Sequence, residues 1–187
     1  MSARSGIQLR VLPRVETTRA LARRYSSLDP TAVEAYLSIV VTGNAISRAI
    51  ESYLARHDIA PGRFGVLMYL LREKDRRGLP SAMAEWLGVT RATITGLLDG
   101  LERDALVRRE PHARDGRMTH VALTAKGQAC LDRLLPDYFR MTGRMVARLD
   151  ERERRTLTRL LGRVREGAAA APSGDLGHGG TRAKRVG

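Results

Sequence analysis

The segment from Ser81 to Gly127 constrains the fold of this chain more than any other. Its first part predicts a short helix over residues 81–87, a tight turn at Gly88-Val89, and a second helix from Thr90 to about Asp104. Two short helices joined by a glycine turn are typical of a helix-turn-helix. Helical pairs of this kind also arise from packing alone, so the pattern needs support from its neighbours.

Two short strands follow the helical pair and supply that support. Residues 106–110 and 118–123 predict an antiparallel two-stranded ribbon, joined by a polar turn at 111–116. The tip of the ribbon exposes arginines on either side of an aspartate, and an arginine at such a tip can enter a narrow minor groove. The aspartate could orient one guanidinium by a charge-assisted hydrogen bond. The alternative is a solvated charged hairpin. The candidate DNA contacts of the tip are Arg114, Asp115 and Arg117.

The second helix of the motif has two different faces. Ile94, Leu97 and Leu101 recur at spacings of three and four residues, so we expect them to share a buried face. The opposite face is small, polar or cationic, which suits a close approach to base edges in a major groove. The start of the helix also offers free N–H groups and a positive dipole end to a phosphate. The candidate DNA contacts of this helix are Thr90, Arg91, Ala92, Thr93, Thr95 and Gly96.

Helical periodicity also dominates the chain before this segment. Asp29-Pro30 predicts a helix start, with apolar residues at helical spacing to about His57. Pro61-Gly62 interrupts the pattern. A second apolar helix then runs through residues 64–71, and a turn is expected at 78–80.

Two more helices are expected after the ribbon. Thr124 should cap a long helix, which Pro136 should kink or split. A last helix opens at a capping box formed by Asp150 and Glu153. The helices flanking the central motif carry more apolar surface than that motif can cover, which predicts a homodimer. The apolar stripe of the last helix consists of Leu157, Leu160, Leu161 and Val164.

The two ends of the chain differ from its middle in composition. Residues 1–28 are rich in arginine and poor in acids, and Thr17 to Tyr25 could form a short helix. We expect a partly ordered extension that packs on the domain; a mitochondrial presequence is the alternative. Residues 167–187 contain an alanine run and several glycines, and we expect a disordered tail.

Charge and composition narrow the classes of function. The 187 residues include 33 Lys+Arg against 20 Asp+Glu, a net charge of +13. This balance favours nucleic acid or an acidic membrane surface as partner, with solubility alone as the plain alternative. The longest uncharged run, Ala35 to Ser47, is shorter than the roughly 20 residues that span a bilayer, so no transmembrane helix is expected. We expect no enzyme, because no nucleophile motif or glycine-rich phosphate loop appears.

Metal and redox sites are not expected. Cys130 is the only cysteine, which excludes internal disulfides and cysteine-rich zinc or iron–sulfur sites. A reducing cytoplasm is the expected location. The four histidines are scattered without metal-ligand spacing, so we expect no metal and no cofactor. Cys130 is interpreted as a core or interface residue.

In this order, the motifs resemble the MarR family of transcriptional regulators. The resemblance extends over about residues 29–166 and includes the final helix from Leu149 to Val164. The motifs that carry it are residues 82–95 and 97–103 of the helical pair, Leu106 to Arg109, the tip Asp115-Gly116-Arg117, and residues 121–127.

The resemblance implies a mainly α-helical fold with a small β-wing. The winged helix-turn-helix would occupy residues 61–124, and the dimerisation helices would occupy 29–60 and 125–166. Three departures from the family pattern are visible. The family often has glycine at the position of Ala105, and a second arginine at that of Gly116. Gly96 and Gly100 lie inside the recognition helix and should cost about 1 kcal/mol each relative to alanine.

The resemblance also implies a function: a homodimer that binds a pseudo-palindromic double-stranded DNA operator, usually as a repressor released by a small ligand. A small aromatic or phenolic effector is expected in a crevice between the dimerisation helices and the winged helix. Two other functions stay open, namely a non-sequence-specific architectural nucleic-acid-binding protein and a helical interaction dimer without DNA binding. The candidate effector residues, each of which could instead be core packing, are Tyr36, Tyr53, Phe64, Met68 and Arg72.

Overall fold

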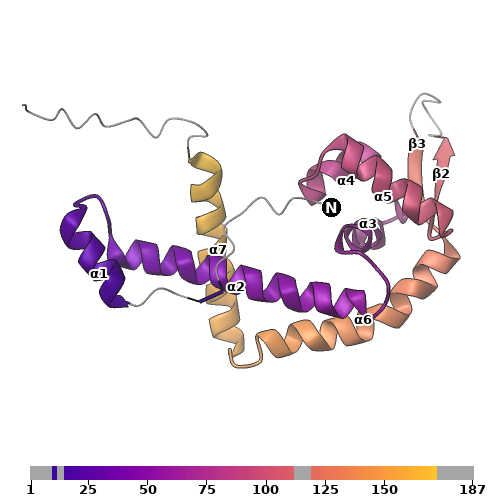
Figure 1. The fold of residues 1–187 in the computed structure, drawn as a ribbon. Helices are drawn as coiled ribbons and strands as arrows, with labels where there is room; N and C mark the ends of the chain where they lie inside the picture. Colours follow the sequence, from indigo (N-terminus) through magenta and orange to yellow (C-terminus); the bar gives the residue numbers. More distant parts are fainter. Residues whose placement is uncertain (1–9, 12–14, 112–118, 172–187) are drawn as a thin grey trace, which may run out of the picture. The chain divides into compact units, whose positions relative to one another are not determined.

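A computed structural model describes residues 10–11, 15–111 and 119–171 of the chain. The described part is mainly helical with one small sheet (Figure 1), which confirms the fold class expected from the sequence. The chain divides into two compact units, Met1–Arg140 and Met141–Gly187. None of the helices in the described ranges is long and apolar enough to cross a bilayer.

The first unit begins with two helices that contact each other, α1 (Val15–Arg24) and α2 (Pro30–Ala55). The short helix expected near the N-terminus is therefore present. Asp29 caps α2 as expected: its carboxylate accepts a hydrogen bond from the backbone N–H of Thr31 at 2.8 Å and another from the Thr31 hydroxyl at 2.7 Å. These hydrogen bonds, led by that of the hydroxyl, lower the pKa of Asp29.

Three short helices follow, and they supply most of the buried apolar residues that lie in helices. Pro61 starts α3 (Pro61–Arg72), as is usual for proline in the first turn of a helix. The next helices are α4 (Pro80–Leu87) and α5 (Arg91–Arg103). Gly88 ends α4 with a left-handed backbone, φ 63°, which glycine adopts without strain. The expected helix-turn-helix is thus formed by α4 and α5, which contact each other.

The sheet has one strand more than the sequence predicted. Its strands are β1 (Arg77–Gly78), β2 (Val107–Pro111) and β3 (Thr119–Leu123), in the antiparallel order β1-β3-β2. The expected turn at 78–80 was wrong at Gly78, which pairs with Val121. A two-residue strand shows no alternation of its own, and it forms here because β3 offers a free edge.

The junction between α5 and the helix α6 (Ala125–Met145) explains two sequence features. Ala105 has a left-handed backbone, φ 57°, at the position where the family often has glycine. Thr124 donates its hydroxyl to the Ala105 carbonyl at 2.7 Å and accepts the N–H of Gly127 at 3.0 Å. A Cβ on Gly127 would lie 2.1 Å from the Leu106 carbonyl oxygen, so only glycine allows α6 to approach this closely.

Pro136 lies inside α6 and does not split it. Proline removes one backbone hydrogen bond from the helix, but packing on both sides of it holds the two halves in one element. Leu131 and Leu134 are buried before Pro136, and Tyr138 contacts the rings of Tyr53 and Phe64 after it. Of the two outcomes expected for this helix, the split was therefore wrong.

The second unit contains α7 (Glu151–Ala170), which starts at the expected capping box. Asp150 accepts the backbone N–H of Glu153 at 2.8 Å, and the Glu153 carboxylate accepts the N–H of Asp150 at 2.8 Å. The helix continues to Ala170, so residues 167–170 are not part of a disordered tail. Alanine is the best helix former, which accounts for the extension. Residues 172–187 lie outside the described residues.

Candidate nucleic-acid interface

The recognition helix α5 is anchored on the core by one apolar side. Ile94, Leu98 and Leu101 are buried, with exposed fractions of 1%, 1% and 0%. The helical period predicts Leu97 on this side, whereas the structure buries Leu98 there. Leu97 is half-buried and lies beside Gly62. A Cβ added to Gly62 would lie 3.1 Å from the Cδ2 atom of Leu97. The expected amphipathic character of α5 is confirmed, with this one shift in its buried face.

The opposite side of α5 is open, as the pattern of small and polar residues predicted. The guanidinium of Arg91 makes no hydrogen bond or ion pair with any residue that the structure describes. The first turn of α5 also carries no acid that would neutralise the positive end of the helix dipole. An anion such as a DNA phosphate suits this end. The exposed residues of this side are Thr90, Arg91, Ala92, Thr93, Thr95 and Gly96.

Three threonine hydroxyls on this side are held in place by local hydrogen bonds. Thr90 caps α5 by accepting the N–H of Thr93 at 3.1 Å, and the two hydroxyl oxygens lie 2.9 Å apart. The Thr95 hydroxyl donates to the Arg91 carbonyl at 2.9 Å. Each oxygen keeps acceptor capacity, and each threonine methyl can contact a thymine methyl. The side chains are therefore ordered before any ligand arrives.

Arg109 ties the base of the β2–β3 hairpin to α5. Its guanidinium donates to the Asp99 carboxylate at 2.6 Å and to the Glu102 carboxylate, and its backbone N–H donates to Glu102 at 3.0 Å. The hydrogen bond to Asp99, together with Glu102, raises the pKa of Arg109. Figure 1 shows α5 beside the hairpin. The sequence did not predict this pairing. Residues two apart on a strand face the same side, so Arg109 lies on the side of β2 from which Val107 faces the core.

The Glu110 carboxylate pairs with two arginines on the other side of the sheet. Its carboxylate lies 3.1 Å from Nε of Arg77 on β1 and 2.6 Å from Nε of Arg108 on its own strand. About half of each arginine side chain is exposed, 50% and 56%. Such exposed pairs contribute little to stability. The described part of the sheet therefore carries charge on both sides, and Arg109 ties one of these sides to the recognition helix.

Arg63 on α3 ties down the far end of α5. It donates to the Gly100 carbonyl at 3.1 Å and pairs with the Asp104 carboxylate. The hydrogen bond from Arg63 lowers the pKa of Asp104. The recognition helix is thus held at one end by α3 and along its side by β2, which makes it a rigid platform for its exposed side.

The tip of the wing carries the other predicted DNA contacts. Arg114, Asp115 and Arg117, which the sequence analysis proposed as minor-groove contacts, lie in residues 112–118, outside the described residues. The strands that lead to the tip are described up to Pro111 and from Thr119, which pair with each other. The role of the tip residues stays a prediction.

The five candidate effector residues do not form one site. Tyr53 and Phe64 are buried, and both contact the Tyr138 ring, at centroid distances of 6.1 and 5.0 Å. Tyr36 is 50% exposed, and it lies 17 residues before Tyr53 on the same helix, which is about 25 Å along the axis. The structure therefore brings Tyr53 and Phe64 together, in an aromatic cluster that also includes His57 and Tyr138, and it leaves Tyr36 apart from them.

The other two candidates are also on α3. Met68 is half-buried and lies four residues after Phe64, on the same side of the helix. The Arg72 guanidinium lies over the rings of Tyr69 and Trp86, 5.3 and 5.2 Å from their centroids, and not over Tyr53 or Phe64. Trp86 is 45% exposed. The period of a helix shows which residues share a side, but it does not show which neighbouring helix they contact. The contact of Arg72 with Tyr69 and Trp86 could therefore not be predicted.

Cys130 is partly buried on α6. The described ranges contain no cluster of three or more His, Cys, Asp or Glu side chains that could hold a metal ion.

Comparisons with known proteins find transcriptional regulators. A model of the MarR family matches residues 57–118. The chain is 33% identical over 156 residues to the HTH-type transcriptional repressor YetL of Bacillus subtilis (strain 168), an alignment that covers 83% of this chain and 93% of YetL.

Solved structures with a similar fold include MarR family regulators bound to DNA. The fold is similar to Sco3205, a MarR family transcriptional regulator from Streptomyces coelicolor in complex with DNA, with a TM-score of 0.67 and 25% identity over 76% of this chain and 90% of that one. It is also similar to a mutant of MarR from E. coli complexed with operator DNA, with a TM-score of 0.59 and 26% identity over 67% and 89% of the two chains.

Proposed function

The chain belongs to the MarR family of transcriptional regulators, and from this premise we propose that it binds a pseudo-palindromic operator as a homodimer. The observation that carries the proposal is the open side of α5, whose arginine and threonines are exposed while its opposite side is buried. An α-helix of this kind fits a major groove, where Arg91 can reach a base edge or a phosphate. Arg114 and Arg117 would add minor-groove contacts.

A homodimer is supported by the apolar surface of α7. Leu157, Leu160, Leu161 and Val164 are all between 38% and 47% exposed. A second copy of the chain would bury this stripe, and an obligate interface of this type is expected to exceed about 2,000 Å². The two-fold symmetry of such a dimer is what makes a palindromic operator its natural target.

Repression released by a small ligand is the finer part of the proposal. The name of YetL, a transcriptional repressor, supports repression by similarity. Release requires a ligand with different affinities for the free and DNA-bound states, and linkage makes the effect reciprocal. The candidate effector is a small aromatic or phenolic acid, and titrating such compounds into the protein–DNA complex tests the idea. No release at millimolar ligand and no shift in melting temperature would contradict it.

An architectural nucleic-acid binder is the second candidate, and two observations favour it. The net charge is +13, and two glycines thin the side chains of α5. A protein of this type would bind all duplexes with similar affinity through phosphate contacts. The third candidate, a helical dimer without DNA binding, would show no affinity for any duplex.

The proposal is tested by comparing Arg91→Ala with the wild type on an operator duplex and on a scrambled duplex of the same length. If Arg91 reaches a base edge, the variant should lose more affinity for the operator than for the scrambled duplex, by about 1–3 kcal/mol. Arg148→Ala, which removes the same charge outside α5, should affect both duplexes little. Equal losses on both duplexes for Arg91→Ala would favour the architectural function instead.

A further inference from the structure

The helix α7 carries an arginine face besides its apolar stripe. Arg152, Arg155, Arg159 and Arg163 are spaced by three, four and four residues, so they lie on one side of the helix. We propose that this arginine face binds a small polyphosphate anion. The site lies outside α5 and the wing, and it would exist whether or not the chain binds DNA.

One carboxylate pairs with the arginine face among the residues that the structure describes. Arg155 pairs with Glu151, but both side chains are more than 75% exposed, so this pair is weak. Arg152, Arg159 and Arg163 make no hydrogen bond or ion pair with the residues that the structure describes. Like charges three and four residues apart repel each other on a helix. An anion bound across the row would remove this repulsion.

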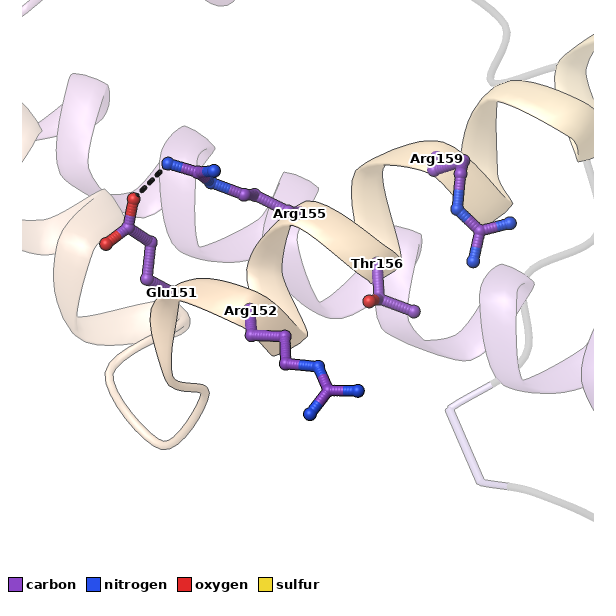
Figure 2. Close-up of a pocket in the computed structure, with 5 residues that line it drawn as sticks. All are labelled: Glu151, Arg152, Arg155, Thr156 and Arg159. Atoms are coloured by element: carbon purple, nitrogen blue, oxygen red, sulfur yellow. Dashed lines mark hydrogen bonds and ion pairs between the residues drawn. The ribbon is translucent and has the colours of Figure 1, made fainter.

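The structure shows a hollow along part of this face. Its lining residues, drawn in Figure 2, are Glu151, Arg152, Arg155, Thr156 and Arg159, and its volume is about 500 Å³. The hollow is open to solvent, so a ligand bound in it would stay partly exposed. In Figure 2 the Arg155 side chain reaches toward Glu151, whereas Arg152 and Arg159 extend away from that pair. The Thr156 hydroxyl adds a neutral donor beside them.

The chemistry and length of the face indicate the class of ligand. The guanidinium group presents paired donors that match phosphate oxygens, and a row of four arginines exceeds what a single phosphate needs. The row is about 16 Å long, from the rise per residue of an α-helix. Glu151 precedes it and Glu166 follows it, so the positive face is bounded at both ends. A bounded face favours a short chain of phosphates over a long polymer such as a duplex.

The face is compatible with a dimer built on the apolar stripe. Leu157, Leu160 and Val164 lie on a different side of α7 from Arg152, Arg159 and Arg163, given 3.6 residues per turn. A partner copy on the stripe would leave the arginines available. It would also bring a second positively charged helix close, which increases the benefit of a bound anion.

The test is calorimetric titration of the full-length protein, without DNA, with inorganic tripolyphosphate at constant ionic strength. Saturable binding is expected, and Arg159→Gln should weaken it at least about threefold. The matched control is Arg165→Gln, which removes the same charge from the same helix outside the row and should leave the affinity within about twofold. A nucleoside triphosphate titrated in parallel shows whether a base and sugar add affinity to the shared phosphate chemistry.

Three outcomes would overturn the proposal. Absence of saturable binding, or equal weakening by Arg159→Gln and Arg165→Gln, would leave the row as a solvated charged face. A triple Arg152→Gln, Arg159→Gln, Arg163→Gln variant that lowers affinity for DNA while tripolyphosphate fails to bind would identify DNA as the anion. The melting temperature of each variant reports folding, and it should rise slightly for the variants within the row, because they reduce its repulsion.

Discussion

Ala105 occupies a backbone conformation that few alanines adopt, with φ 57° at the end of the recognition helix. A left-handed conformation costs a residue with a Cβ roughly 1–2 kcal/mol, and glycine avoids this cost. We therefore expect Ala105→Gly to stabilise the fold by about 1 kcal/mol, measured as the midpoint of urea unfolding. The control Ala129→Gly, in the second turn of α6, should destabilise by about as much. Two shifts of the same sign would contradict this account of the turn.

Gly96 differs from Ala105, because no contact among the residues that the structure describes requires glycine at position 96. A Cβ at this position would meet no atom within 4 Å. Gly96→Ala should therefore stabilise α5 by about 1 kcal/mol. If α5 enters a groove, the same methyl should weaken operator binding, because it separates the helix from the DNA. Gly167→Ala, also without neighbours within 4 Å, is the control that should not affect binding. Unchanged affinity for Gly96→Ala would remove Gly96 from the interface.

At the scale of elements, the hairpin depends on Arg109 for its position on α5. Arg109→Gln should destabilise the fold by no more than about 1 kcal/mol, since the pair is partly exposed. It should nevertheless reduce operator affinity clearly, because the hairpin is no longer held against the recognition helix. Arg108→Gln removes the same charge from the other side of β2 and should have a smaller effect. Partial rescue by Arg109→Lys, measured by fluorescence anisotropy, would separate positioning from overall folding.

The sequence predicted the helices well because local signals mark their ends. Asp29 and Asp150 cap helices, and Gly88 ends one, as their residue types predict. Features that depend on distant partners could not be predicted. The strand β1 exists only through pairing with β3, and the continuity of α6 past Pro136 rests on ring contacts with α2 and α3.

In the candidate interface, too, local features were predictable and features that depend on distant residues were not. The exposed side of α5 was predictable from helical periodicity, since residues on the side opposite the apolar positions must face outward. The choice between Leu97 and Leu98 was not, because both fit the period and only tertiary contacts decide. The pairing of Arg109 with Asp99 and the separation of Arg72 from Tyr53 are tertiary as well.

At the scale of the whole molecule, the proposed dimer rests on the apolar stripe of α7. Leu160→Glu places a charge in the middle of this stripe and should shift the protein toward monomer at micromolar concentration, measured by analytical ultracentrifugation. Thr158→Glu introduces the same charge two residues away and off the stripe, and should leave the dimer intact. A wild type that remains monomeric at this concentration would contradict the dimer itself.

Salt dependence tests the charge distribution of the same assembly. Two recognition helices and two wings should neutralise several phosphates, so the affinity for the operator should fall steeply between 50 and 200 mM salt, by roughly two to three orders of magnitude or more. Arg117→Ala, at the tip of the wing, should weaken binding and reduce the slope of log affinity against log salt. An affinity that barely changes with salt would be inconsistent with phosphate contacts.

The central claim is sequence-specific recognition of DNA by a two-fold symmetric dimer, and selection of bound duplexes from a random pool measures it most directly. The account predicts enrichment of one inverted repeat, with half-site centres about 10 bp apart. The enriched sequence should bind far more tightly than random duplex at the same salt concentration. A pool that stays random although it binds, or an enriched site without dyad symmetry, would contradict the account.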